Sequence, residues 1–366
     1  MKQIFEEILR SLNVQDLKSQ KITVGFDGCC DSVFRVVKNR HSNGSEYFKT
    51  MSEFGEYISQ KGGVSCSIEL EEITRKVGGN CAIFAGAVSA LGIETSAVGL
   101  FGTDNIHSAF ADLAGACKLY SYGENANAIA MEFNDGKVML SPSVKLKTDA
   151  WDSILSSVGV KKMNQIFLQT NMLALLNWSE LEFSTHIWSK LYEYISVYPS
   201  SDQQIIIDLA DCSRNSKDDI CEMLTLIELF NEKRKVILSL NENEALQLAK
   251  HFDLPQKDYR EVGQALARHI KAQTIVIHTA RACYTFEYEK VFEAPGQYNS
   301  RPKLLTGAGD NFNAGYAIGR MLCLDADCCN ILGNSVTSYY VTHGVSPNIF
   351  ELIDHIKMWR DSLDFK

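Results

Sequence analysis

Short aliphatic and β-branched runs alternate with helical patterns along most of the chain, and this alternation limits the possible folds more than any other feature. Strands that are buried on both faces read as continuous apolar runs. Alternation of such strands with helices is typical of a mostly parallel sheet covered by helices on both faces, with ligands at the carboxyl ends of the strands. The predicted strands are 21–26, 95–100, 165–168, 204–207, 236–240 and 274–277.

Two segments interrupt the alternation, and we expect them to form a small β lid over the strand ends. Residues 38–74 are polar and include a helix pattern near 51–60. Residues 120–140 contain two strand patterns joined by Asn134-Asp135-Gly136, which favours a hairpin. The sequence therefore predicts one large α/β domain plus a lid. The predicted core is 1–37, 75–119 and 141–366, with 1–20 as a helical extension, and the predicted lid is 38–74 and 120–140.

Charge and cysteine content restrict the partners of this chain. A net charge of -9 and a pI near 5.5 provide no basic surface for nucleic acid, so a small molecule is the better partner. The eleven cysteines include no Cys-x-x-Cys pair, which favours free thiols in a reducing cytoplasm over zinc binding or disulfides. We expect neither a signal peptide nor a membrane span.

A glycine-paired turn, Thr306-Gly307-Ala308-Gly309-Asp310, runs into an apolar helical stretch. Gly307 and Gly309 allow the backbone to approach an anion closely, and the free N–H groups of the following helix favour negative charge there. Asp310 is placed to accept a proton from a substrate hydroxyl, so the turn predicts phosphoryl transfer. The alternative is an ordinary loop in which Asp310 caps a helix that begins at Asn311.

Further motifs occur in a fixed order around this turn. With them, residues from 24 to about 345 resemble the ribokinase-like (PfkB) carbohydrate kinase family, and the resemblance implies an ATP-dependent kinase that phosphorylates a hydroxyl of a sugar or related metabolite. The motifs are Gly78-Gly79-Asn80 followed by Leu91-Gly92, Val98 to Asp104, Asn241-Glu242-Asn243-Glu244, and Thr306 to Gly315.

The resemblance also implies roles for individual residues. Asp310 is similar to the family's catalytic base, and the backbone of Gly307, Ala308, Gly309 and Asp310 to its anion hole. Asp31 is similar to the carboxylate that binds substrate hydroxyls, and Asp27 is a nearby competitor; either can instead cap the turn. Further substrate contacts are implied at Gly78, Gly79 and Asn80.

Cofactor sites are implied by the same resemblance. Asn241 and Glu244 are similar to a pair that organises Mg²⁺ near the nucleotide phosphates, largely through waters. The same two residues also fit a helix N-cap, and both roles can hold at once. Nucleotide contacts are implied at Thr279, Arg281, Thr306 and Asn334.

Several residues depart from the family pattern, among them His107, which replaces a glycine after Asp104. Leu304 replaces an aspartate linked to a monovalent cation, so activation by such a cation is in doubt. Ile83 replaces an asparagine and makes the sugar pocket more apolar. Arg281 and Tyr284 replace glycines beside the nucleotide, where Arg281 either reaches a phosphate or obstructs the loop.

These departures keep two alternatives open besides a sugar kinase. One is a non-catalytic or regulatory ligand-binding protein on the same fold, and the other is a nucleoside kinase. The exposed edge of a β lid also allows a homodimer. The sequence does not identify the substrate.

Overall fold

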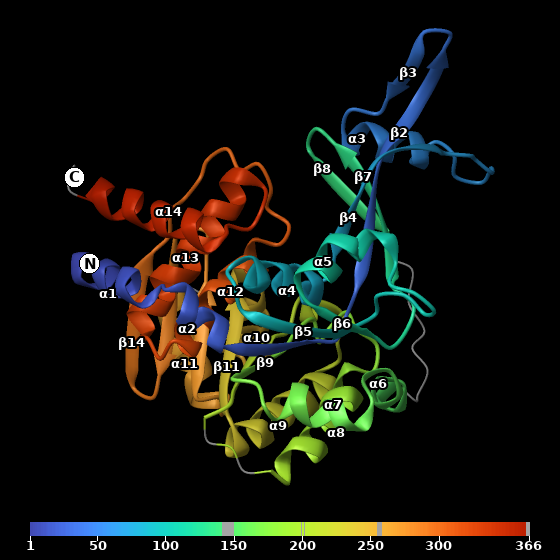
Figure 1. Ribbon diagram of the computed structural model, residues 1–366. Coiled ribbons are helices and arrows are strands. Elements are labelled where there is room, and N and C mark those ends of the chain that lie inside the picture. The colour runs from blue at the N-terminus through green and yellow to red at the C-terminus, as the bar shows by residue number, and fades with distance from the viewer. Residues whose placement is uncertain (141–149, 199, 201, 255–257, 364–366) are drawn as a thin grey trace.

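A nine-stranded sheet forms the centre of the molecule. The computed structural model describes residues 1–140, 150–198, 200, 202–254 and 258–363 (Figure 1). Within these residues the strand order is β14-β13-β12-β11-β10-β9-β1-β5-β6, parallel from β12 to β6, with β13 and β14 antiparallel at one edge. The strands are β1 (Lys21–Gly25), β5 (Glu94–Gly99), β6 (Lys118–Ser121), β9 (Met172–Leu175), β10 (Gln204–Asp208), β11 (Lys235–Asn241), β12 (Thr274–His278), β13 (Ala282–Glu287) and β14 (Lys290–Pro295). The predicted α/β class is confirmed.

Helices cover both faces of this sheet, as Figure 1 shows. One face packs against α1 (Lys2–Ser11), α2 (Val14–Ser19), α4 (Asn80–Ala90), α5 (Ala111–Ala116), α12 (Ala308–Met321), α13 (Ala326–His343) and α14 (Ile349–Ser362). The other packs against α6 (Ala150–Val158), α7 (Val160–Phe167), α8 (Ser184–Ser196), α9 (Lys217–Lys233), α10 (Glu242–His251) and α11 (Tyr259–His269). Two short 3₁₀ turns are Ser108–Phe110 and Cys212–Arg214. No helix in the described ranges has the length and apolar composition needed to cross a bilayer.

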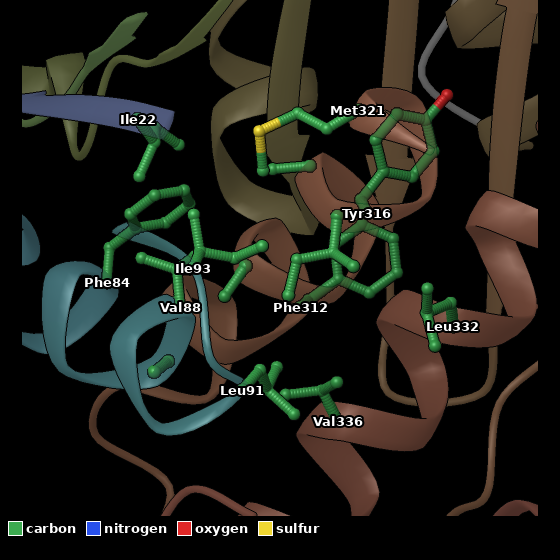
Figure 2. Packing of buried hydrophobic residues seen from close by; sticks show 14 of the residues in the cluster. Ile22, Phe84, Val88, Leu91, Ile93, Phe312, Tyr316, Met321, Leu332 and Val336 are labelled. Carbon is green, nitrogen blue, oxygen red and sulfur yellow. The ribbon is translucent and has the colours of Figure 1, made fainter. Parts of the chain in front are cut away.

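Strand residues alternate between two hydrophobic cores. Ile206 of β10 belongs to the core under α12, whereas Ile205 and Ile207 belong to the core on the opposite face. This alternation follows from the two-residue period of a strand. Figure 2 shows the first core, where Phe84 of α4 and Phe312 of α12 gather among side chains from β1 and α13. This packing fixes α12, and with it the glycine-paired turn, against the sheet.

One predicted strand is wrong. Residues 165–168 lie in and just after helix α7, and the neighbouring strand is β9. Met163, Ile166 and Phe167 are buried on one side of the helix, so their spacing is helical. A short apolar run cannot distinguish the end of a buried helix from a strand. Each of the other five predicted strands overlaps an observed one.

A second sheet stands at one end of the large one, away from the two termini (Figure 1). Long β2 (Cys29–His41) pairs with β4 (Glu69–Gly78), β7 (Ala126–Phe133) and β3 (Gly44–Tyr47), and β8 (Gly136–Leu140) completes the predicted hairpin with β7. Helix α3 (Met51–Ser59) covers this sheet through an aromatic cluster of Phe48, Phe54 and Phe133. We call this sheet with α3 the lid. Strand β2 runs across the predicted boundary between residues 37 and 38, and β4 runs across the one between 74 and 75. The division into core and lid at those positions stays a prediction.

Candidate active site

Polar side chains meet where the central parallel strands end. Asp27 follows β1, Asn177 follows β9, Asp208 ends β10, Asn241 ends β11 and His278 ends β12. Parallel neighbours end at the same edge of a sheet, so residues far apart in sequence become neighbours there. This edge faces the lid and the first turn of α12.

Three cavities join along this edge. A lid-side cavity of about 560 Å³ and a central cleft of about 330 Å³ share Asp31 and Asn80 in their walls. An outer cavity of about 420 Å³ shares Asn241, His278 and Gly309 with the central cleft. A substrate in the lid-side cavity can therefore meet a second ligand in the outer cavity through the cleft.

The turn before α12 opens into the central cleft. Gly307 is the helix N-cap with φ of +88°, and a Cβ there would lie 2.8 Å from the Tyr340 hydroxyl. The helix begins at Ala308 and no side chain caps it, so a capping role for Asp310 finds no support. Instead, Asp310 is 7% exposed and its buried Oδ1 has no hydrogen-bond partner. A carboxylate oxygen without a partner at the start of this helix suits a hydroxyl that loses its proton.

Three buried carboxyl groups face one another in this cleft. Burial raises the pKa of Asp310 well above its usual value, and the charges of Asp208 and Asp27 raise it further. Burial likewise raises the pKa of Asp208 to about 6, although the Asn313 amide donates to it at 2.7 Å. The pKa of Glu244 is raised by burial and by Asp208. A site with such a concentration of negative charge is suited to a cation.

Asp208 was not predicted from the sequence. It ends the apolar run of β10, and the only available signal was a carboxylate directly after a buried strand. The predicted pair Asn241 and Glu244 forms a capping box at the start of α10, in which the Glu244 carboxylate accepts from the Asn241 backbone N–H at 2.9 Å. The N-cap role that the sequence allowed for these two residues is therefore present in the structure. Both residues also line the central cleft, so a second role near a cation remains open.

His278 is a second residue that the sequence did not single out. Its ring stacks on Phe312 with centroids 4.6 Å apart, and its buried Nε2 has no partner. Burial lowers the pKa of His278 to about 4, so the ring is neutral at pH 7. It lines both the outer cavity and the central cleft and brings no charge to either.

Asp27 and Asp31 have different surroundings. The Asp27 carboxylate accepts hydrogen bonds from the backbone N–H groups of Asn80 (3.0 Å) and Cys81 (2.8 Å) and from the Asn177 amide (2.7 Å). It therefore holds the first turn of α4 in place. Asp31 lies on lid strand β2 and lines both the lid-side cavity and the cleft. Its carboxyl group is the more available of the two for a ligand.

The Gly78-Gly79-Asn80 turn connects lid strand β4 to α4. Gly79 has φ of +84°, and a Cβ there would lie 2.6 Å from Asp27 Oδ2. A Cβ on Gly78 would lie 2.8 Å from the Asp31 carboxyl group. Both glycines therefore permit the two aspartates to approach the backbone closely, and the predicted contact of this turn with a substrate stays a prediction.

Asn177 was also missed by sequence reasoning. It has φ of +60°, a conformation that is uncommon for residues other than glycine, and it lines the lid-side cavity. Its Nδ2 donates to Asp27, while its buried Oδ1 has no partner. An unpaired acceptor in a cavity wall is suited to a ligand hydroxyl.

The four predicted nucleotide contacts lie in different places. Thr279 and Asn334 line the outer cavity, and Asn334 donates to the Pro295 carbonyl at 2.9 Å. Arg281 stacks on Tyr298, a wall residue, with its guanidinium 4.4 Å from the ring centroid. Thr306 lines the central cleft instead.

The remaining departures also have defined positions. Tyr284 is partly buried against the core that includes α10 and α11, and it is absent from the described walls of the outer cavity. The expectation that it stands beside a nucleotide is therefore not supported. Ile83 lines the central cleft, and Leu304 is only partly buried in the segment before the turn.

Comparisons with known proteins bear on the family and the fold of the chain. The sequence model of the family described as prokaryotic ketohexokinase matches residues 5–358. A curated ketohexokinase from Haloferax volcanii is 25% identical over 339 residues, which covers 91% of this chain and 89% of that protein. Two solved structures share the fold. Arabidopsis thaliana ribokinase complexed with ribose and ATP has a TM-score of 0.60 and 16% identity, covering 92% of this chain and 98% of that one. A putative ribokinase II from E. coli in complex with ATP and Mg²⁺ has a TM-score of 0.61 and 14% identity, covering 93% and 99%.

Proposed function

Because the chain belongs to the prokaryotic ketohexokinase family, we propose that it transfers the γ-phosphoryl group of ATP to a hydroxyl of a ketohexose. The chain is a carbohydrate kinase of the ribokinase-like (PfkB) type. The ketohexose is our proposal and follows the names of the family and of the curated relative. The observation that carries the mechanism is the unpartnered Asp310 carboxylate in the cleft between two cavities.

The sugar is proposed to occupy the lid-side cavity. Asp31 and the free Oδ1 of Asn177 accept hydrogen bonds from its hydroxyls, and Asn80 both donates and accepts. Asp27 acts indirectly, because its bonds to Asn177 and to the start of α4 fix these groups. Gly78 and Gly79 keep the approach to the backbone open.

Asp310 is proposed as the general base. It takes the proton of the reacting hydroxyl as that oxygen forms a bond to the γ-phosphorus, and the bond from phosphorus to the β,γ-bridging oxygen breaks to release ADP. Burial and nearby carboxylates raise the pKa of Asp310, which strengthens it as a base. The backbone N–H groups of Gly307 and Gly309 stabilise the charge on the transferred group, and the Ala308 N–H joins them once it leaves the Leu305 carbonyl, to which it donates at 3.0 Å.

Mg²⁺ is typical of such kinases, and the residues present fit it. Within the described residues no three His, Cys, Asp or Glu side chains form a direct metal site, but Mg²⁺ commonly binds through one or two carboxylates, waters and substrate phosphates. Glu244 and Asp208 would hold it, with Asn241 orienting Glu244 at 2.6 Å. When bound, the ion supplies positive charge to the phosphates. Burial raises the pKa of both carboxyl groups, and a bound cation would favour their ionised form.

The outer cavity is proposed as the site of the adenosine part of ATP. Thr279 and Asn334 contribute polar groups to its wall, and Thr306 is placed nearer the phosphates. Arg281 can reach a phosphate only after it leaves the Tyr298 ring. We therefore assign Arg281 a secondary role in nucleotide binding.

We also propose a homodimer through the lid and a cytoplasmic location. In the described part of the lid, β4 pairs only with β2 and β8 only with β7, which leaves two edges for a second copy. Ile73 and Leu140 on these strands are 43% and 48% exposed. All eleven cysteines are free, as expected in a reducing compartment.

A substrate panel tests the proposed function. Purified protein with Mg²⁺ and ATP should release ADP with ketohexoses, and much more slowly with aldoses, sugar acids and nucleosides. Activity restricted to nucleosides would replace the proposed substrate by the nucleoside-kinase alternative. The non-catalytic alternative is not favoured, and ATP turnover with any sugar excludes it.

A further inference from the structure

The central cleft contains negative charge without a balancing basic side chain. Five carboxylates line it, and none of its described wall residues is a lysine or an arginine. The one histidine in the wall is neutral at pH 7, because burial lowers its pKa to about 4. The five are Asp31, Asp208, Asp211, Glu244 and Asp310. Wherever these carboxyl groups are ionised, a transferred phosphoryl group that enters this cleft meets like charge, which costs free energy unless cations accompany it.

The outer cavity does not supply the missing charge. No lysine or arginine is among its described wall residues, and the guanidinium of Arg281 is stacked on Tyr298. On the other side, Arg214 lines the lid-side cavity but forms an ion pair with Glu180. A Mg²⁺ ion would offset only two of the negative charges in the cleft. A further cation close to the cleft would therefore help a phosphoryl group to bind there.

One lysine of the lid reaches the edge of the cleft. Lys137 follows the turn between β7 and β8, and its ammonium group donates to the hydroxyl of Thr306 at 2.8 Å. Thr306 lines the central cleft and directly precedes Gly307, the first residue of the anion-binding turn. The hydrogen bond joins residues 169 positions apart and connects the lid to the catalytic turn.

Lys137 is not held by a carboxylate in the described part of the chain. Its cross-strand neighbour in β7 is Glu132, but the two form no ion pair there. By contrast, two other basic residues of the lid are paired within it: Lys38 bonds Glu53, and Arg40 bonds Glu69. The ammonium of Lys137 is thus held only by a neutral hydroxyl, which it can exchange for a phosphate oxygen at little cost.

We propose that Lys137 is a catalytic residue of the phosphoryl transfer, supplied by the lid. With sugar and ATP bound, its ammonium moves from Thr306 to the non-bridging oxygens of the γ-phosphoryl group. There it stabilises the charge that develops as the sugar oxygen binds phosphorus and the bond to ADP breaks, while the proton goes to Asp310. Because the lid also covers the sugar cavity, the charge arrives only when the sugar is enclosed. This proposal rests on the proposed kinase function.

The test compares Lys137→Met and Lys137→Arg with Lys61→Met, which removes a lid lysine that stacks on Tyr57 in the lid itself. Lys137→Met should lower kcat on the order of 100-fold with little change in the KM of the sugar. Lys137→Arg should retain most of the rate, and Lys61→Met should retain all of it. Lys137 is exposed, so all three variants should fold, which circular dichroism verifies.

A binding measurement separates catalysis from simple lid closure. ADP with aluminium fluoride and sugar mimics the transferred phosphoryl group, and Lys137→Met should weaken its binding by about the same factor as kcat. Binding of ADP with sugar alone should change much less. An unchanged kcat, or a rise in KM at constant kcat, would overturn the catalytic role. A wild-type protein that phosphorylates no sugar would instead overturn the proposed function on which this role depends.

Discussion

Lys303 donates a hydrogen bond from its ammonium group to the carbonyl oxygen of His343, over 2.9 Å. That carbonyl lies in the last turn of α13, where the helix dipole places negative charge. The backbone N–H of Lys303 donates to the Val341 carbonyl at 2.7 Å as well. One residue therefore ties the segment before the anion-binding turn to the end of a buried helix.

We predict that the rate of this enzyme does not depend on potassium. Leu304 offers no carboxylate to a monovalent cation, and the Lys303 ammonium already provides a positive charge at the end of α13. Lys303→Met should lower the free energy of unfolding by about 0.3–1 kcal/mol, as expected for loss of a cation at an exposed helix C-terminus, and Lys303→Arg should be milder. Rates in sodium, potassium and tetramethylammonium chloride test the independence from potassium. Strong activation of the wild-type enzyme by potassium would contradict it.

Asp310→Asn should abolish most of the turnover and leave ligand binding intact. Asparagine has nearly the same shape but cannot accept the hydroxyl proton, so kcat should fall by about 10²- to 10⁴-fold. Calorimetric titration should show ATP and sugar affinities close to those of the wild type. Asp112→Asn, an exposed change in α5, serves as the control. Near-normal turnover in Asp310→Asn would exclude Asp310 as the base.

Asp208 should make the ligand-free protein less stable as pH rises. Burial raises the pKa of Asp208 from its usual 3.8 to about 6, so the native state holds this proton more tightly than the unfolded chain does. The stabilisation that comes from this bound proton is complete below about pH 4, and it is lost as the pH rises through about 6. Asp208→Asn should remove this loss and raise the free energy of unfolding at pH 7 by at most about 3 kcal/mol.

Urea unfolding from pH 4 to 8 without ligands measures this effect. The wild type should lose stability across that range, and Asp208→Asn should lose distinctly less. The same variant should need more Mg²⁺ for half-maximal activity, because one carboxylate near the proposed ion is missing. If the free energy of unfolding depended on pH equally in the two proteins, the pKa of Asp208 would not be raised in the ligand-free state.

The glycine-paired turn at the start of α12 could be recognised from the sequence because its residues are local in the chain. Gly307, Gly309 and Asp310 are near neighbours in the chain, and helix geometry alone places the amides beside the carboxylate. Asp208 and Asn177 could not be found in this way. Each ends or follows a buried strand, and only the parallel order of β9, β10 and β1 brings them to one edge.

The choice between Asp27 and Asp31 shows the same limit. Both follow the first strand within a few residues, and their roles differ because Asp27 accepts from backbone N–H groups more than fifty residues later. No local pattern encodes that contact. Likewise, the apolar run at 165–168 has no period long enough to separate helix from strand, and packing decides it.

Gly79→Ala should destabilise the protein and weaken sugar binding together. Alanine rarely adopts a φ of +84°, and its Cβ would lie 2.6 Å from Asp27 Oδ2. The backbone strain alone is worth roughly 1–3 kcal/mol, and displacement of Asp27 would also disturb Asn177. Gly115→Ala in α5 is a matched control, because a Cβ there has no atom within 4 Å. The unfolding temperature should fall and the KM of the sugar should rise for Gly79→Ala only, whereas Gly115→Ala should keep the KM and stabilise the helix slightly.

Asn177 should contribute to sugar affinity through its unpaired Oδ1. Asn177→Leu keeps a similar volume but removes the acceptor and the bond to Asp27, so the KM of the sugar should rise by about 5- to 150-fold, as for loss of 1–3 kcal/mol. The KM of ATP at saturating sugar should stay unchanged. Deoxy analogues of the sugar identify the hydroxyl involved. The analogue that lacks this hydroxyl should bind the wild type weakly and should lose no further affinity in Asn177→Leu. If removal of the hydroxyl weakened binding equally in both proteins, Asn177 would not contact it.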